Sequence, residues 1–285
     1  MILSFHPCID ADIQMILGDR ALDSSHLKAI EKAKAVILPQ ACTQDLYKAS
    51  IRCAAHVFPC YEARIQYPGK VGQHGLFEKF ALRSPRTWCW QGARHFEQTC
   101  LPSGPFPHDF PFVIKQDLIH EGEGVFFIED QAHLNEALNH LRAQERSGPS
   151  AFISQDYVPC GGNALRAVIV GKEIITYWKR PETPKEVITT ISRGAKVDHE
   201  WQPELQQKGV VQARILSEKT GINLAAVDFV FPLGAGDPEP LFLEINYYFG
   251  RRGLGGTQTY YGLLYAAMRD WLEESGLDPD RVRLV

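Results

Sequence analysis

Two neighbouring segments, AAVDFVF at residues 225–231 and PLFLEINYY at residues 240–248, determine which fold this chain can adopt. Both are apolar runs of strand length, and the loop between them, PLGAGDPEP, is rich in residues that favour turns. The two segments are therefore predicted to pair as an antiparallel hairpin. A register symmetric about Gly236 places Asp228 opposite Glu244, and Asn246 shares their face because side chains alternate along a strand.

Acids are unusual inside such apolar strands, because an ionised carboxylate in an apolar sheet is costly without compensation. Two carboxylates placed opposite each other repel unless a cation lies between them, and hard oxygen ligands select Mg²⁺ or Mn²⁺. Asp228, Glu244 and Asn246 are thus candidate metal ligands. Two separate acids with ordinary hydrogen-bonded roles explain this hairpin equally well on its own.

Basic residues lie on neighbouring predicted strands. ALRAVIV at residues 164–170 and EIITYWK at residues 173–179 are joined by a two-residue turn, Gly171-Lys172. That register pairs Arg166 with Tyr177 and places Lys179 one diagonal step away on the same face. A polyanion lying over the two cations would explain them, and so would a solvated sheet face.

The strand FPFVIKQ carries Lys115 near its end and precedes the glycine-bearing segment HEGEG, which includes Gly122 and Gly124. A glycine-bearing hairpin can bring backbone amides close to phosphate groups, although such glycines commonly mark only a turn.

The remaining pattern predicts an α/β chain. Short apolar strands alternate with helices over the first 58 residues, which indicates a small parallel sheet flanked by helices. Strands then dominate, with predicted helices at 131–144, 203–221 and 259–276.

Composition excludes several classes of protein. The net charge of −4 argues against a general nucleic-acid binder, since phosphate backbones are held by surplus Lys and Arg. No apolar run reaches membrane-spanning length, and the first residues lack the pattern expected of a signal peptide. The seven cysteines include no CxxC pair, so free thiols in a reducing cytoplasm are expected.

The order of these motifs resembles the ATP-grasp superfamily, and within it the RimK-like ligases, which join a carboxylate to an amine. The resemblance runs from about Val71 to Thr257 and rests on the motifs VIK (113–115), EGEG (121–124), SQDYV (154–158), LRAVIVG (165–171), ISRG (191–194), VDFVF (227–231) and LEIN (243–246), together with Lys79. It implies an ATP-grasp fold at 76–285, with lobes at 76–154 and 155–285, preceded by a small parallel-sheet domain at 1–75.

The resemblance also implies a role for each matching residue. Lys79 and Lys115 resemble the two nucleotide lysines. Lys179, which the strand register places beside Arg166, is added to them as a further contact to the nucleotide. Arg166 and Arg193 resemble the arginines that steady the transferred phosphoryl group, and Asp228, Glu244 and Asn246 match the Mg²⁺ ligands. The loop over the phosphates would include Glu121, Gly122 and Gly124, and the adenine hinge Gln155, Asp156, Tyr157 and Val158.

Two positions depart from the family pattern: Ala164 stands where an acid is common, and Thr190 where an asparagine is common. Downstream, Arg251 and Arg252 lie on a glycine-rich loop that suits carboxylate or phosphate recognition, since guanidinium groups bind such anions bidentately. An exposed basic turn is the alternative interpretation of that pair, and substrate contact is the one we favour.

The function implied is ATP-dependent ligation through an acyl phosphate, with ATP and Mg²⁺ (or Mn²⁺) as cofactors. The substrate would be a small molecule or peptide with a carboxylate, no nucleic acid or membrane would take part, and a homodimer would follow the family's habit. Two alternatives share the nucleotide site: a phosphotransferase that stops at the phosphorylated product, and a nucleotide-binding regulator without turnover.

Overall fold

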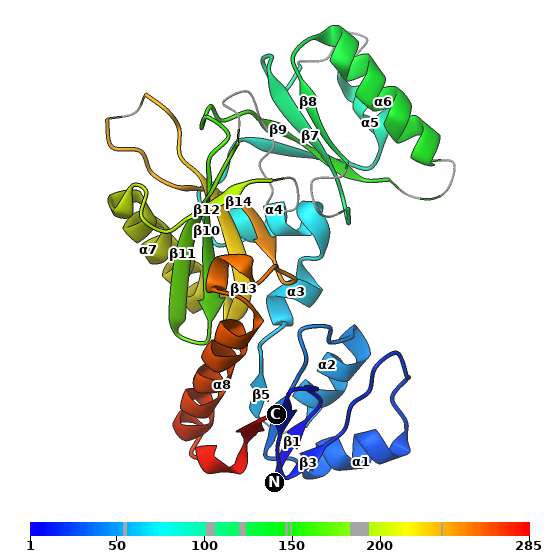
Figure 1. The fold of residues 1–285 in the computed structure, drawn as a ribbon. Coiled ribbons are helices and arrows are strands. Elements are labelled where there is room, and N and C mark those ends of the chain that lie inside the picture. The colour runs from blue at the N-terminus through cyan, green and yellow to red at the C-terminus, as the bar shows by residue number, and fades with distance from the viewer. Residues whose placement is uncertain are drawn as a thin grey trace.

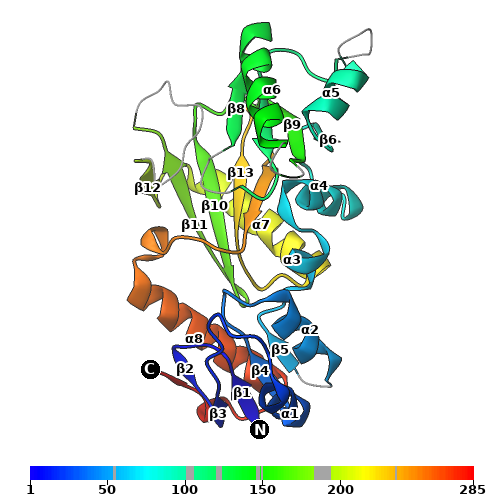
Figure 2. The same cartoon turned by 90° about the vertical axis from the view of Figure 1, so that its right-hand side faces the viewer.

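The computed structural model describes residues 1–53, 56–100, 106–119, 124–145, 148, 150–182, 194–234 and 236–285. Three units are stacked along the long axis of the molecule, with the N-terminal domain at one end, a five-stranded lobe in the middle and a four-stranded lobe at the other end (Figures 1 and 2).

The N-terminal domain has the parallel sheet that the alternating pattern predicts. Its strands run in the order β3-β1-β4-β5 and all pair in parallel. The strands are β1 (Ile2–Ser4), β3 (Ile13–Gln14), β4 (Ala35–Ile37) and β5 (His56–Phe58), and the helices are α1 (Ser24–Lys32) and α2 (Gln44–Arg52). Helices α3 (Glu62–Gln66) and α4 (Gly69–Lys79) lead out of this domain, so the boundary predicted at residue 75 falls inside α4.

The four-stranded lobe is an antiparallel sheet in the order β6-β9-β7-β8 with both helices on one face. Its elements are β6 (Thr87–Trp90), α5 (Ala93–Cys100), β7 (Phe112–Gln116), β8 (Val125–Ile128), α6 (Gln131–Glu145) and β9 (Phe152–Asp156). Strict alternation in β7 buries Phe112 and Ile114 against the helices. The Lys115 side chain therefore lies on the other face of the sheet, away from the helices. The lobe boundary predicted at residue 155 falls inside β9.

The five-stranded lobe is antiparallel in the order β12-β11-β10-β13-β14. Its elements are β10 (Ala164–Val170), β11 (Glu173–Arg180), β12 (Lys196–Asp198), α7 (Pro203–Thr220), β13 (Leu224–Val230) and β14 (Leu241–Asn246). The predicted registers are confirmed, since Asp228 pairs with Glu244 and Arg166 with Tyr177.

Two helices cover opposite faces of this five-stranded sheet. Helix α7 packs on the face that carries Leu165 and Val227, whereas α8 (Thr257–Glu274) packs on the face that carries Val168 and Ala226. By alternation Arg166 and Asp228 lie on the same face as α8. They are, however, at the strand ends away from the Gly171-Lys172 turn, and it is at this turn that α8 packs. At that end the side chains line a cleft instead of packing against α8.

The last part of the chain returns to the N-terminal domain. After the short turns η2 (Arg252–Leu254) and η3 (Pro279–Arg281), β15 (Arg283–Leu284) pairs with β2 (Ile9–Asp10). Residues of α8 share one apolar core with β1, β4 and the five-stranded sheet. The N-terminal domain and the middle lobe are thereby joined through a common core. No helix among the described residues is both long and apolar enough to cross a membrane.

Candidate functional site

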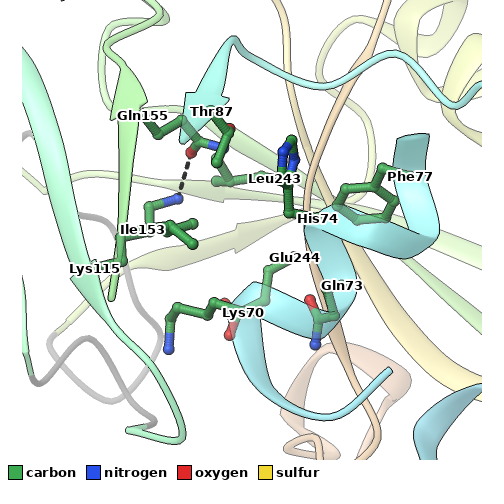
Figure 3. A pocket seen from close by; sticks show the side chains of 10 residues that line it. All are labelled: Lys70, Gln73, His74, Phe77, Thr87, Lys115, Ile153, Gln155, Leu243 and Glu244. Atoms are coloured by element: carbon green, nitrogen blue, oxygen red, sulfur yellow. Dashed lines mark hydrogen bonds between the residues drawn. The ribbon is translucent and has the colours of Figure 1, made fainter. Parts of the chain in front are cut away.

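A cleft of about 960 Å³ runs between the two antiparallel lobes and reaches the N-terminal domain at α3. Small-molecule sites commonly occupy about 300–1,000 Å³, so this cleft can hold one large ligand or two smaller ones. Its walls come from β7, β8 and β9 on one side and from β10, β11, β13 and β14 on the other. A narrow recess of about 20 Å³, roughly the space of one water, adjoins the cleft beside Lys115 and Glu244 (Figure 3).

Asp228 is the centre of the charged floor. Its Oδ1 accepts a hydrogen bond from Arg166 Nε at 2.7 Å, and its Oδ2 accepts from Arg166 Nη2 at 2.8 Å and Lys179 Nζ at 2.9 Å. The carboxyl is buried, which raises its pKa, but Arg166 and Lys179 outweigh that effect and hold the pKa of Asp228 well below its usual range. Asp228 is therefore ionised at neutral pH and fixes both cations.

Glu244 and Asn246 complete the predicted trio. Asn246 Nδ2 donates to Asp228 Oδ2 at 3.2 Å, which leaves the amide oxygen of Asn246 for another contact. Glu244 lies directly opposite Asp228, lines the cleft, and has no hydrogen-bond partner among the residues that the structure describes. These are hard oxygen donors of the type Mg²⁺ prefers. The residues fit a metal, with Glu244 the most open ligand and Asp228 shared with two cations.

The described part of the chain contains no cluster of three or more His, Cys, Asp or Glu side chains suited to a metal. Any metal here would thus be held by the two acids and one amide, and by groups of a bound ligand.

Lys115 faces this floor from the opposite lobe. Its Nζ donates to Gln155 Oε1 at 2.7 Å, and Gln155 Nε2 donates in turn to Thr87 Oγ1 at 2.9 Å (Figure 3). Burial lowers the pKa of Lys115 to about 8, although Glu244 opposes the shift. Burial likewise lowers the pKa of Lys179, against the effect of Asp228. Cations so placed are stabilised further when an anion enters the cleft.

The connection between the lobes forms one end of the cleft. Asp156, Tyr157 and Val158 line it, and the Tyr157 ring packs against Phe127 of β8 with centroids 4.9 Å apart. Phe127 and Tyr157 therefore form an apolar wall at this end of the cleft, which suits a flat ring.

The opposite end of the cleft is lined by arginines. Arg251 Nη2 donates to the Tyr261 hydroxyl at 3.0 Å, and its guanidinium lies 4.5 Å from the Tyr261 ring centroid. Arg252 is exposed at the start of η2. Arg64 of α3 also lines the cleft; it donates to the Gln40 carbonyl at 3.1 Å. No carboxylate among the described residues pairs with these three arginines.

Sequence reasoning missed Arg64 and Lys70. Lys70 lies in the first turn of α4, lines both the cleft and the recess, and donates from Nζ to the carbonyl of Ile119. A cation in a first helical turn opposes the helix dipole, but the local sequence gave no sign that a helix begins at Gly69. The predicted Lys79 lies exposed at the other end of α4, with its Nζ 5.5 Å from the Tyr67 ring, and does not line the cleft.

Three predicted site residues, Glu121, Gly122 and Arg193, lie outside the described residues. Gly124 is described and has a φ of +66°, a conformation that favours glycine. Its carbonyl accepts a hydrogen bond from the Gln116 amide at 2.8 Å, which closes the base of the β7–β8 hairpin. Gly124 therefore helps to form the turn between β7 and β8, whatever else it contacts. Ala164 pairs with Lys179, so the position of the missing acid adjoins the charged floor.

Comparison with known proteins yields one family match. A family model described as the RimK-like ATP-grasp domain matches residues 91–261, which is more than half of the chain. Two curated relatives, both named probable alpha-L-glutamate ligase, come from Azotobacter vinelandii (27% identical over 154 residues, 53% of this chain) and Pseudomonas paraeruginosa (26% over 149 residues, 52% of this chain). Each match covers 46% of the relative, so this chain spans about half the length of the curated relatives it matches.

Solved structures show similarity in fold. An ADP complex of N5-carboxyaminoimidazole ribonucleotide synthetase aligns with a TM-score of 0.59 at 16% identity, over 85% of this chain and 60% of that one. A RimK domain protein from Sphaerobacter thermophilus aligns with a TM-score of 0.56 at 15% identity, over 92% of this chain and 97% of that one. D-alanine–D-alanine ligase from Bacillus anthracis aligns with a TM-score of 0.58 at 12% identity, over 92% of this chain and 84% of that one.

Proposed function

This chain belongs to the RimK-like ATP-grasp family, and on that premise we propose that it is an ATP-dependent ligase that joins a carboxylate to an amine. The ATP-grasp fold predicted from the motif order is confirmed by the structural similarities. The observation that carries the proposed activity is the floor of the cleft, where Asp228 and Glu244 face each other beneath Lys115.

In the proposed complex, ATP lies along the cleft with its adenine at Asp156–Val158 and its phosphates over the charged floor. Lys70, Lys115 and Lys179 hold the phosphates, and Arg166, anchored by Asp228, faces the transferred group. Lys70 takes the place in this arrangement that the sequence had suggested for Lys79, because it lines the cleft. Glu121, Gly122 and Gly124 keep their proposed role over the phosphates, and Arg193 its role at the phosphoryl group.

The proposed reaction has two steps. An oxygen of the substrate carboxylate attacks the γ-phosphorus, the bond from that phosphorus to the β–γ bridging oxygen breaks, and ADP leaves. The amine nitrogen then attacks the acyl carbon, the carbon–oxygen bond to phosphate breaks, and the nitrogen loses a proton. Mg²⁺, held by Asp228, Glu244 and Asn246, would offset phosphate charge. Fixed cations at Arg166 and Lys115 stabilise the charge that develops, without reorganising during the reaction.

The substrate end is proposed to hold an acidic amino acid or a peptide with an acidic group. Arg64, Arg251 and Arg252 line that end without a carboxylate partner among the described residues, and guanidinium groups bind carboxylates bidentately. Two relatives are named glutamate ligases, which makes glutamate the first candidate.

The seven cysteines are free thiols, which supports the proposed cytoplasmic location. A homodimer remains part of the proposal and is tested by the mass of the protein in solution.

The proposed activity is tested by incubating the protein with ATP, Mg²⁺ and a panel of amino acids and acidic peptides, and measuring ADP and phosphate together. A ligase releases both in equal amounts and only when amine and carboxylate are present. ADP without free phosphate would favour the phosphotransferase, and nucleotide binding without ADP under the whole panel would favour the regulator.

The metal assignment is tested by Glu244→Gln, for which ADP release should fall about 100-fold, because a ligand to the charge-stabilising ion is lost. Glu239→Gln is the matched control, since Glu239 lies in the loop before β14 and pairs with Lys208. Unchanged ADP release by Glu244→Gln would show that Glu244 holds no essential metal.

A further inference from the structure

A buried network lies behind the interlobe connection, on the helix-covered face of the four-stranded sheet. His108 has a fully buried side chain, and its Nδ1 lies 2.6 Å from Asp156 Oδ1. Its Nε2 lies 2.8 Å from Ser154 Oγ. Trp90 Nε1 donates to the same Ser154 oxygen at 2.7 Å. Side chains from β6, β9 and the segment before β7 thus meet at a single imidazole (Figure 2 shows β6 beside β9).

These contacts assign the proton positions. The Asp156 carboxylate can only accept, so Nδ1 of His108 carries the hydrogen and donates to Asp156. In the neutral ring Nε2 is then an acceptor, and it receives the hydroxyl hydrogen of Ser154, whose oxygen also accepts from Trp90. Burial lowers the pKa of His108, against the effect of Asp156, so the imidazole is neutral at neutral pH. Every hydrogen-bonding group of the three side chains at this imidazole has a defined partner.

The same three residue types form the nucleophilic triad of many hydrolases, but this arrangement cannot act that way. Ser154 is fully buried within β9, its oxygen is shared with Trp90, and it lines neither the cleft nor the recess. The network must therefore act through the residues it holds.

The residue held is Asp156, which ends β9 and lines the cleft where the connection begins. The Asp156 carboxylate also accepts from Arg86 Nε at 2.9 Å, and the Asp156 amide donates to the Arg86 carbonyl at 2.9 Å. The His108 ring is itself fixed, because it stacks on Phe112 at 4.9 Å and meets the edge of Trp88 at 4.7 Å. Asp156 is thus held from the β6 side by Arg86 and from the β7 side by His108.

We propose that His108 is a positioning residue for the nucleotide: by fixing the Asp156 carboxylate, it orients the backbone of Asp156–Val158 that meets the nucleobase. The proposal rests on the proposed nucleotide site. Binding to a pre-oriented backbone avoids the cost of ordering it, and a misplacement of about 1 Å is enough to weaken such contacts. His108 lies in a proline-rich segment, FPHDFP, that carries none of the motifs on which the family resemblance rests.

Replacing His108 with Asn or with Gln tests its hydrogen bonds to Asp156 and to Ser154 separately. The amide of His108→Asn can reach the position of Nδ1 and donate to Asp156, whereas that of His108→Gln can reach the position of Nε2 and bond to Ser154. His108→Phe keeps the stacking on Phe112 and loses both hydrogen bonds. His133→Asn is the control, because His133 makes the same Nδ1 contact, to Asp130 at 2.9 Å, on an exposed helix end.

The measurement is the dissociation constant of the Mg²⁺ complex of a non-hydrolysable ATP analogue, with thermal unfolding of each variant in parallel. His108→Gln and His108→Phe should bind the analogue about tenfold more weakly, and His108→Asn within about twofold of the unchanged protein. Ser154→Ala, which leaves the Asp156 contact in place, should bind normally, as should His133→Asn. In turnover, the KM for ATP should rise in His108→Gln while kcat is retained.

Two results would overturn the proposal while leaving the nucleotide site intact. One is unchanged affinity in His108→Gln and His108→Phe. The other is affinity that follows thermal stability in all variants, with His108→Asn and Ser154→Ala as weak as His108→Phe. Failure of the unchanged protein to bind the analogue would instead overturn the proposed function, and the positioning role with it.

Discussion

At the scale of single residues, Asp228 and Glu244 have different tasks although they are neighbours across two strands. Asp228 is buried and compensates Arg166 and Lys179, whereas Glu244 is half-buried and open to the cleft. Asp228→Asn should therefore destabilise the fold by about 3–5 kcal/mol, because two buried cations lose their counter-charge. Urea unfolding monitored by circular dichroism measures this change.

The control for this prediction is Asp237→Asn, which removes an exposed carboxylate that pairs with Lys208. Exposed pairs contribute at most about 1 kcal/mol, so its stability should hardly change. Equal losses for Asp228→Asn and Asp237→Asn would contradict the central role of Asp228 in the charged floor.

Lys115 makes nucleotide binding depend on pH. Its pKa in the free protein is about 8, because burial lowers it. Only the protonated lysine attracts phosphate. The affinity for the ATP analogue should therefore be highest well below pH 8 and should fall as the pH rises through that value. Isothermal titration between pH 6.5 and 9.5 measures this dependence. Lys115→Arg should bind the analogue with little change over the range, since a guanidinium keeps its charge. A persistent fall in that variant would assign the pH effect to another group.

At the scale of elements, two helical glycines are expected to respond in opposite ways to alanine. Gly209 in α7 faces β10, and a Cβ there would lie 2.4 Å from Leu165 Cδ2. Gly262 in α8 is exposed, and a Cβ there would have no neighbouring atom within 4 Å. Alanine favours a helix over glycine by about 1 kcal/mol, so Gly262→Ala should stabilise the protein.

Gly209→Ala should destabilise the protein by about 1–3 kcal/mol, because overpacking against Leu165 exceeds the gain in helix propensity. Urea unfolding of the two variants measures both effects. Stabilisation by both substitutions would mean that α7 can move away from the sheet at little cost, and the close packing at Gly209 would then be unimportant.

The charged hairpin shows what local sequence determines. Alternation and a turn-rich loop were enough to predict that Asp228 faces Glu244, because both signals act over a few residues. A bulge between Asp228 and Phe229 shifts the register beyond that pair, and no local signal announced it. The predicted pairing is therefore correct at the site and fails one residue further on.

The start of α4 shows what local sequence cannot determine. The sequence GLFEKFALRS, residues 75–84, favours a short helix that starts at Gly75, whereas α4 begins at Gly69. The N-cap, Pro68, provides no side-chain cap; instead the carboxylate of Asp117, 46 residues away, accepts from the amide of Val71 at 3.2 Å. A cap from another lobe is invisible in the local sequence, and Lys70 was missed as a site residue for the same reason.

At the scale of the whole molecule, the N-terminal domain and the five-stranded lobe share an apolar core, and the four-stranded lobe has one of its own. One core joins the N-terminal sheet, α8 and the five-stranded sheet, whereas the four-stranded lobe has a core built only from its own residues. That lobe meets the rest of the protein through α4, the interlobe connection and the cleft. The lobe is therefore the unit that can move when a ligand enters, because its motion leaves every core intact.

This unequal connection predicts two levels of protection in native-state hydrogen exchange followed by mass spectrometry. Leu138→Ala, in the core of the four-stranded lobe, should lower the opening free energy of β7 and β9 by about 2–5 kcal/mol and leave β1 and β10 unchanged. Met268→Ala, in the shared core, should lower protection in β1 and β10 together, since α8 packs on both sheets. If Leu138→Ala lowered protection equally throughout, the lobe would not open by itself. Closure over a nucleotide would then have to come from local loop motion, because the cores would form one cooperative unit.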